Sequence, residues 1–256
     1  MSPARHFHRL AWVAVILAFG IIFLGNLACR GGLAWPNALQ AIAYAEVHRH
    51  LTAILGLLVV GLALLVARRR PRGPSGWTDG ATWLSMSLLM LVTFQALLGI
   101  WTMIWPIKPF IVMIHLASGL ATFALLSALA WWTTPNSGRV HADAPRLRWL
   151  LWIGLMLLAV QIALDDWVAA TRIVQRIGAV IVTAYFLFLG FRLAISPGFR
   201  TSGGVLLALL LLQLGLGMVN ALMELPLWAL TMQWMMAVVM LFVIVTLLAR
   251  LRSLEV

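Results

Sequence analysis

Two histidines in otherwise apolar segments are the side chains of this sequence best suited to bind a metal. His48 lies near the start of the apolar run 46–67, and His115 lies near the start of the apolar run 110–133. Ionisable residues inside a membrane segment are costly and are therefore candidates for function. Two imidazoles that face each other across a helix bundle suit the axial positions of haem iron. Zinc is a poorer match, because it normally takes three or four protein ligands.

Charged residues flank both histidines. Glu46 lies two residues before His48, while Arg49 and Lys108 lie near the same ends of the expected helices. The two cations are candidates to pair with haem propionates. The same positions also suit cations that snorkel to the membrane surface, and the sequence leaves both roles open.

The composition is that of a membrane protein with several spans. Hydrophobic residues make up 63% of the 256 positions, whereas a soluble domain rarely exceeds about half. A helix needs roughly 20 residues to cross the hydrocarbon core. Eight stretches are long enough, and we expect an all-α integral membrane protein with spans at about 10–28, 46–67, 82–105, 110–133, 147–165, 173–195, 202–222 and 227–249.

The net charge of +11 is distributed as in a membrane protein, not as in a nucleic-acid-binding one. Most arginines fall in alternate short connections, which predicts that both termini lie in the cytoplasm, with the chain in the inner (plasma) membrane. No basic face with interleaved aromatic residues appears, so we expect no nucleic-acid partner. The single cysteine, Cys29, rules out an intrachain disulfide.

An internal repeat divides the chain into two sets of four helices, and we place the domains at 1–138 and 139–256. The motif Gln95–Gly99 reappears as Gln213–Gly217, and His48-Arg49 reappears as Gln175-Arg176. His115 stands six residues after Pro109, and Met232 stands six residues after Pro226. These spacings predict that Gln175 and Met232 are the second-half counterparts of the two histidines.

The run from Phe94 to Thr122, through Lys108-Pro109 and His115, resembles the second-hairpin motif of the haem A synthase family. His48-Arg49 followed by Gly56 resembles the second-helix motif of that family. Further matches lie in the second half, at Gln161–Leu164, Arg176–Ala179 and Gln213–Pro226.

The resemblance implies two pseudo-symmetric four-helix bundles. In members of the family, each bundle contains a pair of histidines. The resemblance implies oxidation of a haem O methyl group to the formyl group of haem A, with the iron held by His48 and His115. It also implies a haem b in the second bundle. The implied partners are the lipid bilayer, haem, haem O synthase and terminal oxidase subunits.

This chain departs from the family pattern at three places. Gln175 and Met232 replace the second histidine pair, so we expect no conventional haem in the second bundle. The family glutamate lies three residues before the first histidine, where this chain has Ala45. Glu46 is shifted by about 100° around the helix, and it is retained as the catalytic candidate. The first-loop cysteine pair often found in the family is reduced to Cys29.

Two functions of different classes remain after this comparison. The leading interpretation is a membrane oxidoreductase of the haem A synthase type with one haem site. The alternative is a non-catalytic haem carrier or assembly factor for a terminal oxidase. A transmembrane electron-transfer cytochrome is disfavoured, because one histidine pair near one face cannot provide a haem at each side. A transporter is disfavoured because no charged residue lies in mid-membrane.

Overall fold

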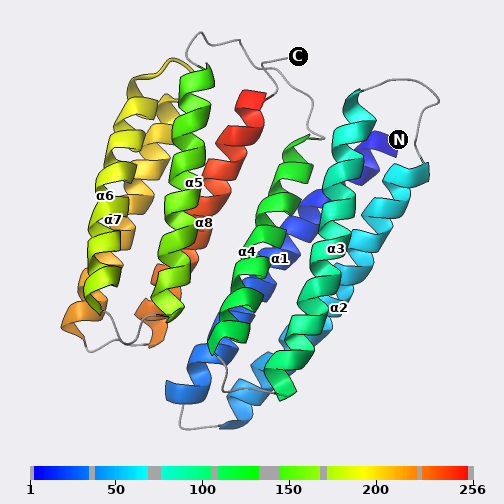
Figure 1. Ribbon diagram of the computed structural model, residues 1–256, viewed down its shortest axis with the longest axis horizontal. Coiled ribbons are helices and arrows are strands. Elements are labelled where there is room, and N and C mark those ends of the chain that lie inside the picture. The colour runs from blue at the N-terminus through cyan, green and yellow to red at the C-terminus, as the bar shows by residue number, and fades with distance from the viewer. Residues whose placement is uncertain are drawn as a thin grey trace. The chain divides into compact units, whose positions relative to one another are not determined.

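The computed structural model describes residues 3–34, 38–68, 76–104, 109–132, 144–167, 172–223 and 227–252, and these residues form helices joined by short connections. The eight helices are shown in Figure 1. They are α1 (Pro3–Ala34), α2 (Ala38–Arg68), α3 (Gly76–Ile104), α4 (Pro109–Trp132), α5 (Ala144–Trp167), α6 (Arg172–Ile195), α7 (Arg200–Leu222) and α8 (Leu227–Arg252).

The predicted all-α membrane fold is confirmed. Each of the eight helices contains a segment long and apolar enough to cross a membrane. Helices are the expected solution, because hydrocarbon offers no partner for an unpaired backbone N–H or C=O group. The main difference from the sequence-based ranges is at α1 and α2, which are longer than their apolar runs. The helix α2 begins at Ala38 instead of residue 46, since apolar composition marks only the part inside the hydrocarbon.

The chain forms two compact units, residues 1–135 and 136–256. Within the first unit each helix packs against two others, in the ring α1–α2–α3–α4 that closes back on α1. The second unit repeats this arrangement as α5–α6–α7–α8. Helices α2 and α4 are therefore diagonal across the first bundle, as are α6 and α8 across the second. We refer to the units as the first and second bundles.

The buried residues of α2 and α6 repeat with an offset of 127 positions. Val59 and Leu62 on α2 correspond to Phe186 and Leu189 on α6, and all four side chains are at most 1% exposed. The same offset places Gln175 at the position of His48. The burial pattern thus agrees with the counterpart expected from the sequence.

The α3–α4 and α7–α8 hairpins repeat with an offset of 118 positions. This offset changes the residue that corresponds to His115. Helix α4 begins at Pro109, whereas α8 begins at Leu227, one residue after the proline. This offset pairs His115 with Gln233. The prediction of Met232 is therefore wrong by one position, because it took the two prolines as equivalent. Met232 is 40% exposed, on the outer surface of the bundle.

Burial along α4 and α8 supports the offset of 118. Leu126 and Leu129 on α4 are fully buried, and so are their counterparts Ile244 and Leu247, at 1% exposure or less.

The close contact between α6 and α7 depends on glycines in the turn and in the helices. The turn between them contains Gly198 at φ 81°, a conformation that glycine adopts at little cost. Beyond the turn, a Cβ atom at Gly203 would overlap the backbone of Ala194 and lie 2.7 Å from the carbonyl oxygen of Gly190. The helices can approach this closely only because residue 203 has no side chain.

We predict that Gly203→Ala destabilises the second bundle by about 1–3 kcal/mol, because rigid backbone must move. Gly204→Ala is the matched control, since a Cβ there meets nothing within 4 Å. The control should be neutral or slightly stabilising, because alanine favours helices. Thermal unfolding in detergent measures both, and equal midpoints for the two variants would contradict this packing.

Candidate functional site

His48 is held by the neighbouring helix α1. Its Nδ1 atom lies 2.9 Å from the carbonyl oxygen of Ile21. A carbonyl only accepts, so Nδ1 carries the proton and donates it to Ile21. The lone pair of Nε2 then remains available to a ligand. This is the arrangement by which an outer hydrogen bond fixes the tautomer and orientation of a metal-binding histidine.

Gly25 on α1 provides the space in which the His48 ring lies. A Cβ atom at this position would be 2.9 Å from Cε1 and 3.1 Å from Nδ1 of His48. Any larger residue would therefore push the imidazole out of place. The next residue, Asn26, is 4% exposed, and its Oδ1 atom has no hydrogen-bond partner in the described part of the chain.

His115 is supported by α3 in a similar way. Its Cε1 atom would be 3.7 Å from a Cβ atom at Gly99. The ring also lies close to the backbone of Gln95, and the Gln95 side chain accepts a hydrogen bond from Thr122 at 3.1 Å. The Nδ1 atom of His115 is buried and has no partner among the described residues.

The structure brings the two histidines into one region of the first bundle. They project from the diagonal helices α2 and α4. They also lie at matching depth, six and five residues from the first residues of the apolar segments that begin at Ile42 and Phe110. The described residues contain no group of three or more His, Cys, Asp or Glu side chains around a common point. A pair of imidazoles without further ligands suits axial ligation.

A hydroxyl group follows each histidine by about one helical turn. Thr52 donates to the carbonyl oxygen of His48 at 2.8 Å, and Ser118 donates to that of His115 at 2.9 Å. These bonds satisfy the hydroxyls inside an apolar bundle. Sequence analysis missed these hydroxyls, although each follows its histidine by three or four residues. It also missed the supporting glycines, whose contacts depend on which helices are neighbours.

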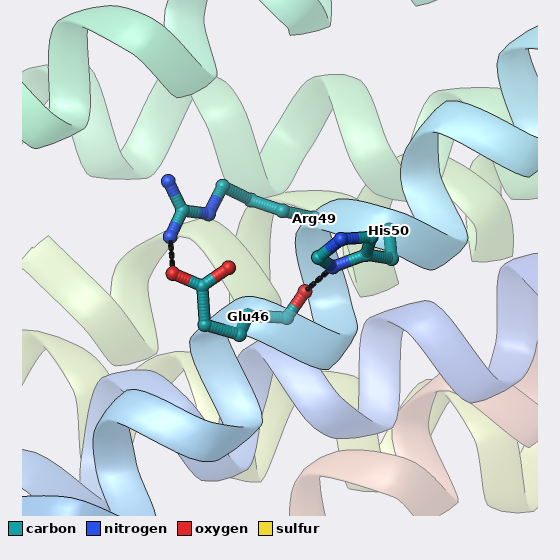
Figure 2. A network of polar contacts seen from close by, with 3 residues as sticks. All are labelled: Glu46, Arg49 and His50. Carbon is teal, nitrogen blue, oxygen red and sulfur yellow. Dashed lines mark hydrogen bonds and ion pairs between the residues drawn. The ribbon is translucent and has the colours of Figure 1, made fainter.

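Glu46 and Arg49 lie on the outer surface of α2, away from the histidine pair. Their side chains are about half exposed and form an ion pair with each other (Figure 2). The Nδ1 atom of His50 binds the carbonyl oxygen of Glu46 at 2.8 Å, also on this surface. The structure therefore does not bring Glu46 or Arg49 together with His48 and His115. Lys108 lies outside the described residues.

Comparison with known proteins gives two matches. Residues 37–175, more than half of the chain, match the family described as cytochrome oxidase assembly proteins. The chain is also 26% identical over 233 residues to the Heme A synthase of Shewanella oneidensis, in an alignment that covers 71% of this chain and 68% of that protein. The matched range 37–175 contains both histidines.

We predict that Gly25→Ala displaces the His48 ring and breaks its bond to Ile21. Nitrogen NMR of histidine-labelled protein should show His48 protonated on Nδ1, and Gly25→Ala should change that signal. Gly20→Ala is the control on the same helix, because a Cβ there meets nothing within 4 Å. An unchanged His48 signal in Gly25→Ala would contradict the placement of the ring.

Proposed function

Since the chain belongs to the haem A synthase family of cytochrome oxidase assembly proteins, we propose that it is a multi-pass membrane oxidoreductase acting in haem A synthesis. Its substrate is haem O, and the reaction oxidises a ring methyl group to a formyl group. The site is the first bundle. The observation that carries the proposal is the His48–His115 pair on diagonal helices at matching depth.

The two imidazoles fit a haem iron. His48 has its Nδ1 atom bonded to Ile21, which directs Nε2 as the ligand atom. His115 offers an imidazole whose Nδ1 atom is buried without a partner among the described residues. The iron supplies the oxidative chemistry when haem is bound. The protein binds the macrocycle, orients one edge of the ring and excludes water from it.

The remaining members of the proposed site serve binding. Arg49 and Lys108 are proposed to pair with the haem propionates. Such pairing requires Arg49 to leave its surface partner Glu46, which costs little because exposed ion pairs are weak, at about 0–1 kcal/mol. Oxidation of a methyl to a formyl group requires an oxidant, which is supplied from outside the chain, and electrons are exchanged with an external donor or a partner subunit.

The cellular setting follows from the same proposal. The chain lies in the inner membrane with both termini in the cytoplasm, and the histidine pair lies near the outer face. Haem O synthase and subunits of the terminal oxidase are the proposed partners, as source of the substrate and destination of the product.

The alternative function is a haem carrier or assembly factor without catalysis. One observation favours it: Glu46, the catalytic candidate, is half exposed, about 200° round the helix from His48, and is bound to Arg49. The two functions differ in one measurement, because only the enzyme forms haem A from haem O.

We expect His48→Ala and His115→Ala each to abolish haem A formation and to remove haem from the purified protein, because each variant loses one axial ligand. His50→Ala should retain both, since its ring lies on the outer surface of α2. Pigment analysis of membranes from a host that makes haem O but lacks its own synthase measures the product. Haem binding without any haem A in the unaltered chain would support the carrier instead.

Glu46→Gln tests the catalytic role of the carboxylate. From its position we expect haem binding to be unchanged and the rate of haem A formation to fall less than about tenfold, whereas loss of a general acid or base typically costs about 100- to 10,000-fold. Glu46→Ala serves as a second variant without the polar group. A loss of more than about 100-fold in both, with haem retained, would place Glu46 in the reaction.

A further inference from the structure

Carboxamide side chains gather at one end of the second bundle. This end is formed by the later turns of α5 and α7 and the first turns of α6 and α8. Each of the four helices contributes, and the second bundle has no other asparagine or glutamine in its described part. The residues are Gln161 on α5, Gln175 on α6, Gln213 and Asn220 on α7, and Gln233 on α8.

Hydrogen bonds join these residues in pairs across neighbouring helices. The Gln161 Nε2 atom donates to the carbonyl oxygen of Gln175 at 3.4 Å. Asn220 donates through Nδ2 to the Oε1 atom of Gln233. The first bond ties α5 to α6, and the second ties α7 to α8. We call the five residues the carboxamide cluster.

The cluster contains acceptors that remain unpaired. The oxygens Gln161 Oε1, Gln213 Oε1 and Asn220 Oδ1 are buried and have no hydrogen-bond partner among the described residues. Asn220 as a whole is only 4% exposed. Unpaired polar groups in a membrane interior cost several kcal/mol each. Uncharged molecules with O–H or N–H donors, such as water, suit these oxygens, whereas haem iron calls for imidazole, thiolate or thioether ligands.

The cluster occupies the position of the histidine pair in the first bundle. His115 lies against Gly99, sixteen residues earlier, and Gln233 lies against Gly217, again sixteen residues earlier, with its Nε2 atom 3.5 Å from a Cβ built on that glycine. Gln175 is the counterpart of His48. Both axial positions therefore hold carboxamides, which are poor iron ligands, and the haem b implied by the family does not fit here.

The residues that accompany the histidines are also replaced. By the offsets of 127 and 118, the counterpart of Thr52 is Ala179, that of Ser118 is Met236 and that of Thr122 is Met240. The three hydroxyl groups around the first site thus all become apolar.

One exchange explains an unpaired oxygen of the cluster. In the first bundle Gln95 accepts from Thr122. Its counterpart Gln213 faces a helix with Met240 at the matching position, so its Oε1 atom has lost that donor.

We infer that the second bundle contains a converted cofactor site, in which a carboxamide cluster built around Gln175 and Gln233 replaces a haem and its two ligands. The unpaired carboxamide oxygens suit uncharged hydrogen-bond donors such as water, and this bundle folds without a haem. The inference concerns the second bundle alone, so it holds or fails independently of catalysis in the first.

The test restores the histidines and counts haem in the purified full-length chain. The background is His48→Ala with His115→Ala, which removes the proposed first site and is expected to bind no haem. Adding Gln175→His and Gln233→His should give about one haem per chain, with the absorption spectrum of a bis-imidazole haem. The matched control adds Gln175→His and Met232→His, and it should bind none, because residue 232 faces outward. Protohaem is the probe, and thermal unfolding establishes that each variant is folded.

Three results would overturn the inference. The first is haem that remains bound to the His48→Ala, His115→Ala protein. This result is measured without either of the added histidines. The second is equal loading of the Met232→His control, which would restore the proline-based alignment. The third is a folded protein with both Gln175→His and Gln233→His added that binds no haem.

Discussion

The hydrogen bond from His48 to the carbonyl oxygen of Ile21 is the interaction on which the site of this protein depends. In hydrocarbon a polar side chain must be paired, and a helix bundle offers few partners besides backbone carbonyls and hydroxyls. The hydrogen bond through Nδ1 pairs one ring nitrogen and fixes the orientation of the imidazole. The protein therefore determines the direction of the other nitrogen, Nε2. The contact also requires a glycine, because α1 must approach the ring closely at Gly25.

The two bundles show how one helical scaffold accommodates two kinds of polar interior. In the first, a few hydrogen bonds position imidazoles and leave a ligand atom available. In the second, carboxamides bond to one another and to backbone, and three of their oxygens are left as unpaired acceptors among the described residues. Both use the same ring of helices and the same glycine on the third helix, at Gly99 and Gly217. If the second bundle holds no haem, as we infer, electrons cannot pass between two haems, and the proposed redox partner must exchange electrons with the first bundle directly.

Much of the fold was predictable because the length of an apolar run identifies a helix that can span a membrane. The placement of His48 and His115 on diagonal helices of one bundle was predictable because both residues are polar in apolar runs, one helical hairpin apart. Three features were not. The Met232 assignment failed because a proline marks a helix start only to within a residue, and one residue turns a side chain by about 100°. Glu46 could not be placed, because its direction depends on the helical phase of α2. The glycine contacts depend on which helices are neighbours, which the sequence does not specify.

The central claim is that His48 and His115 together hold one haem in the first bundle. A cryo-electron microscopy structure of the chain loaded with haem tests this most directly. It should show the iron between the Nε2 atoms of His48 and His115, with the His48 Nδ1 atom still bonded to Ile21 and no porphyrin in the second bundle. Iron bound by any other residue, or a haem between α6 and α8 in the second bundle, would contradict the account.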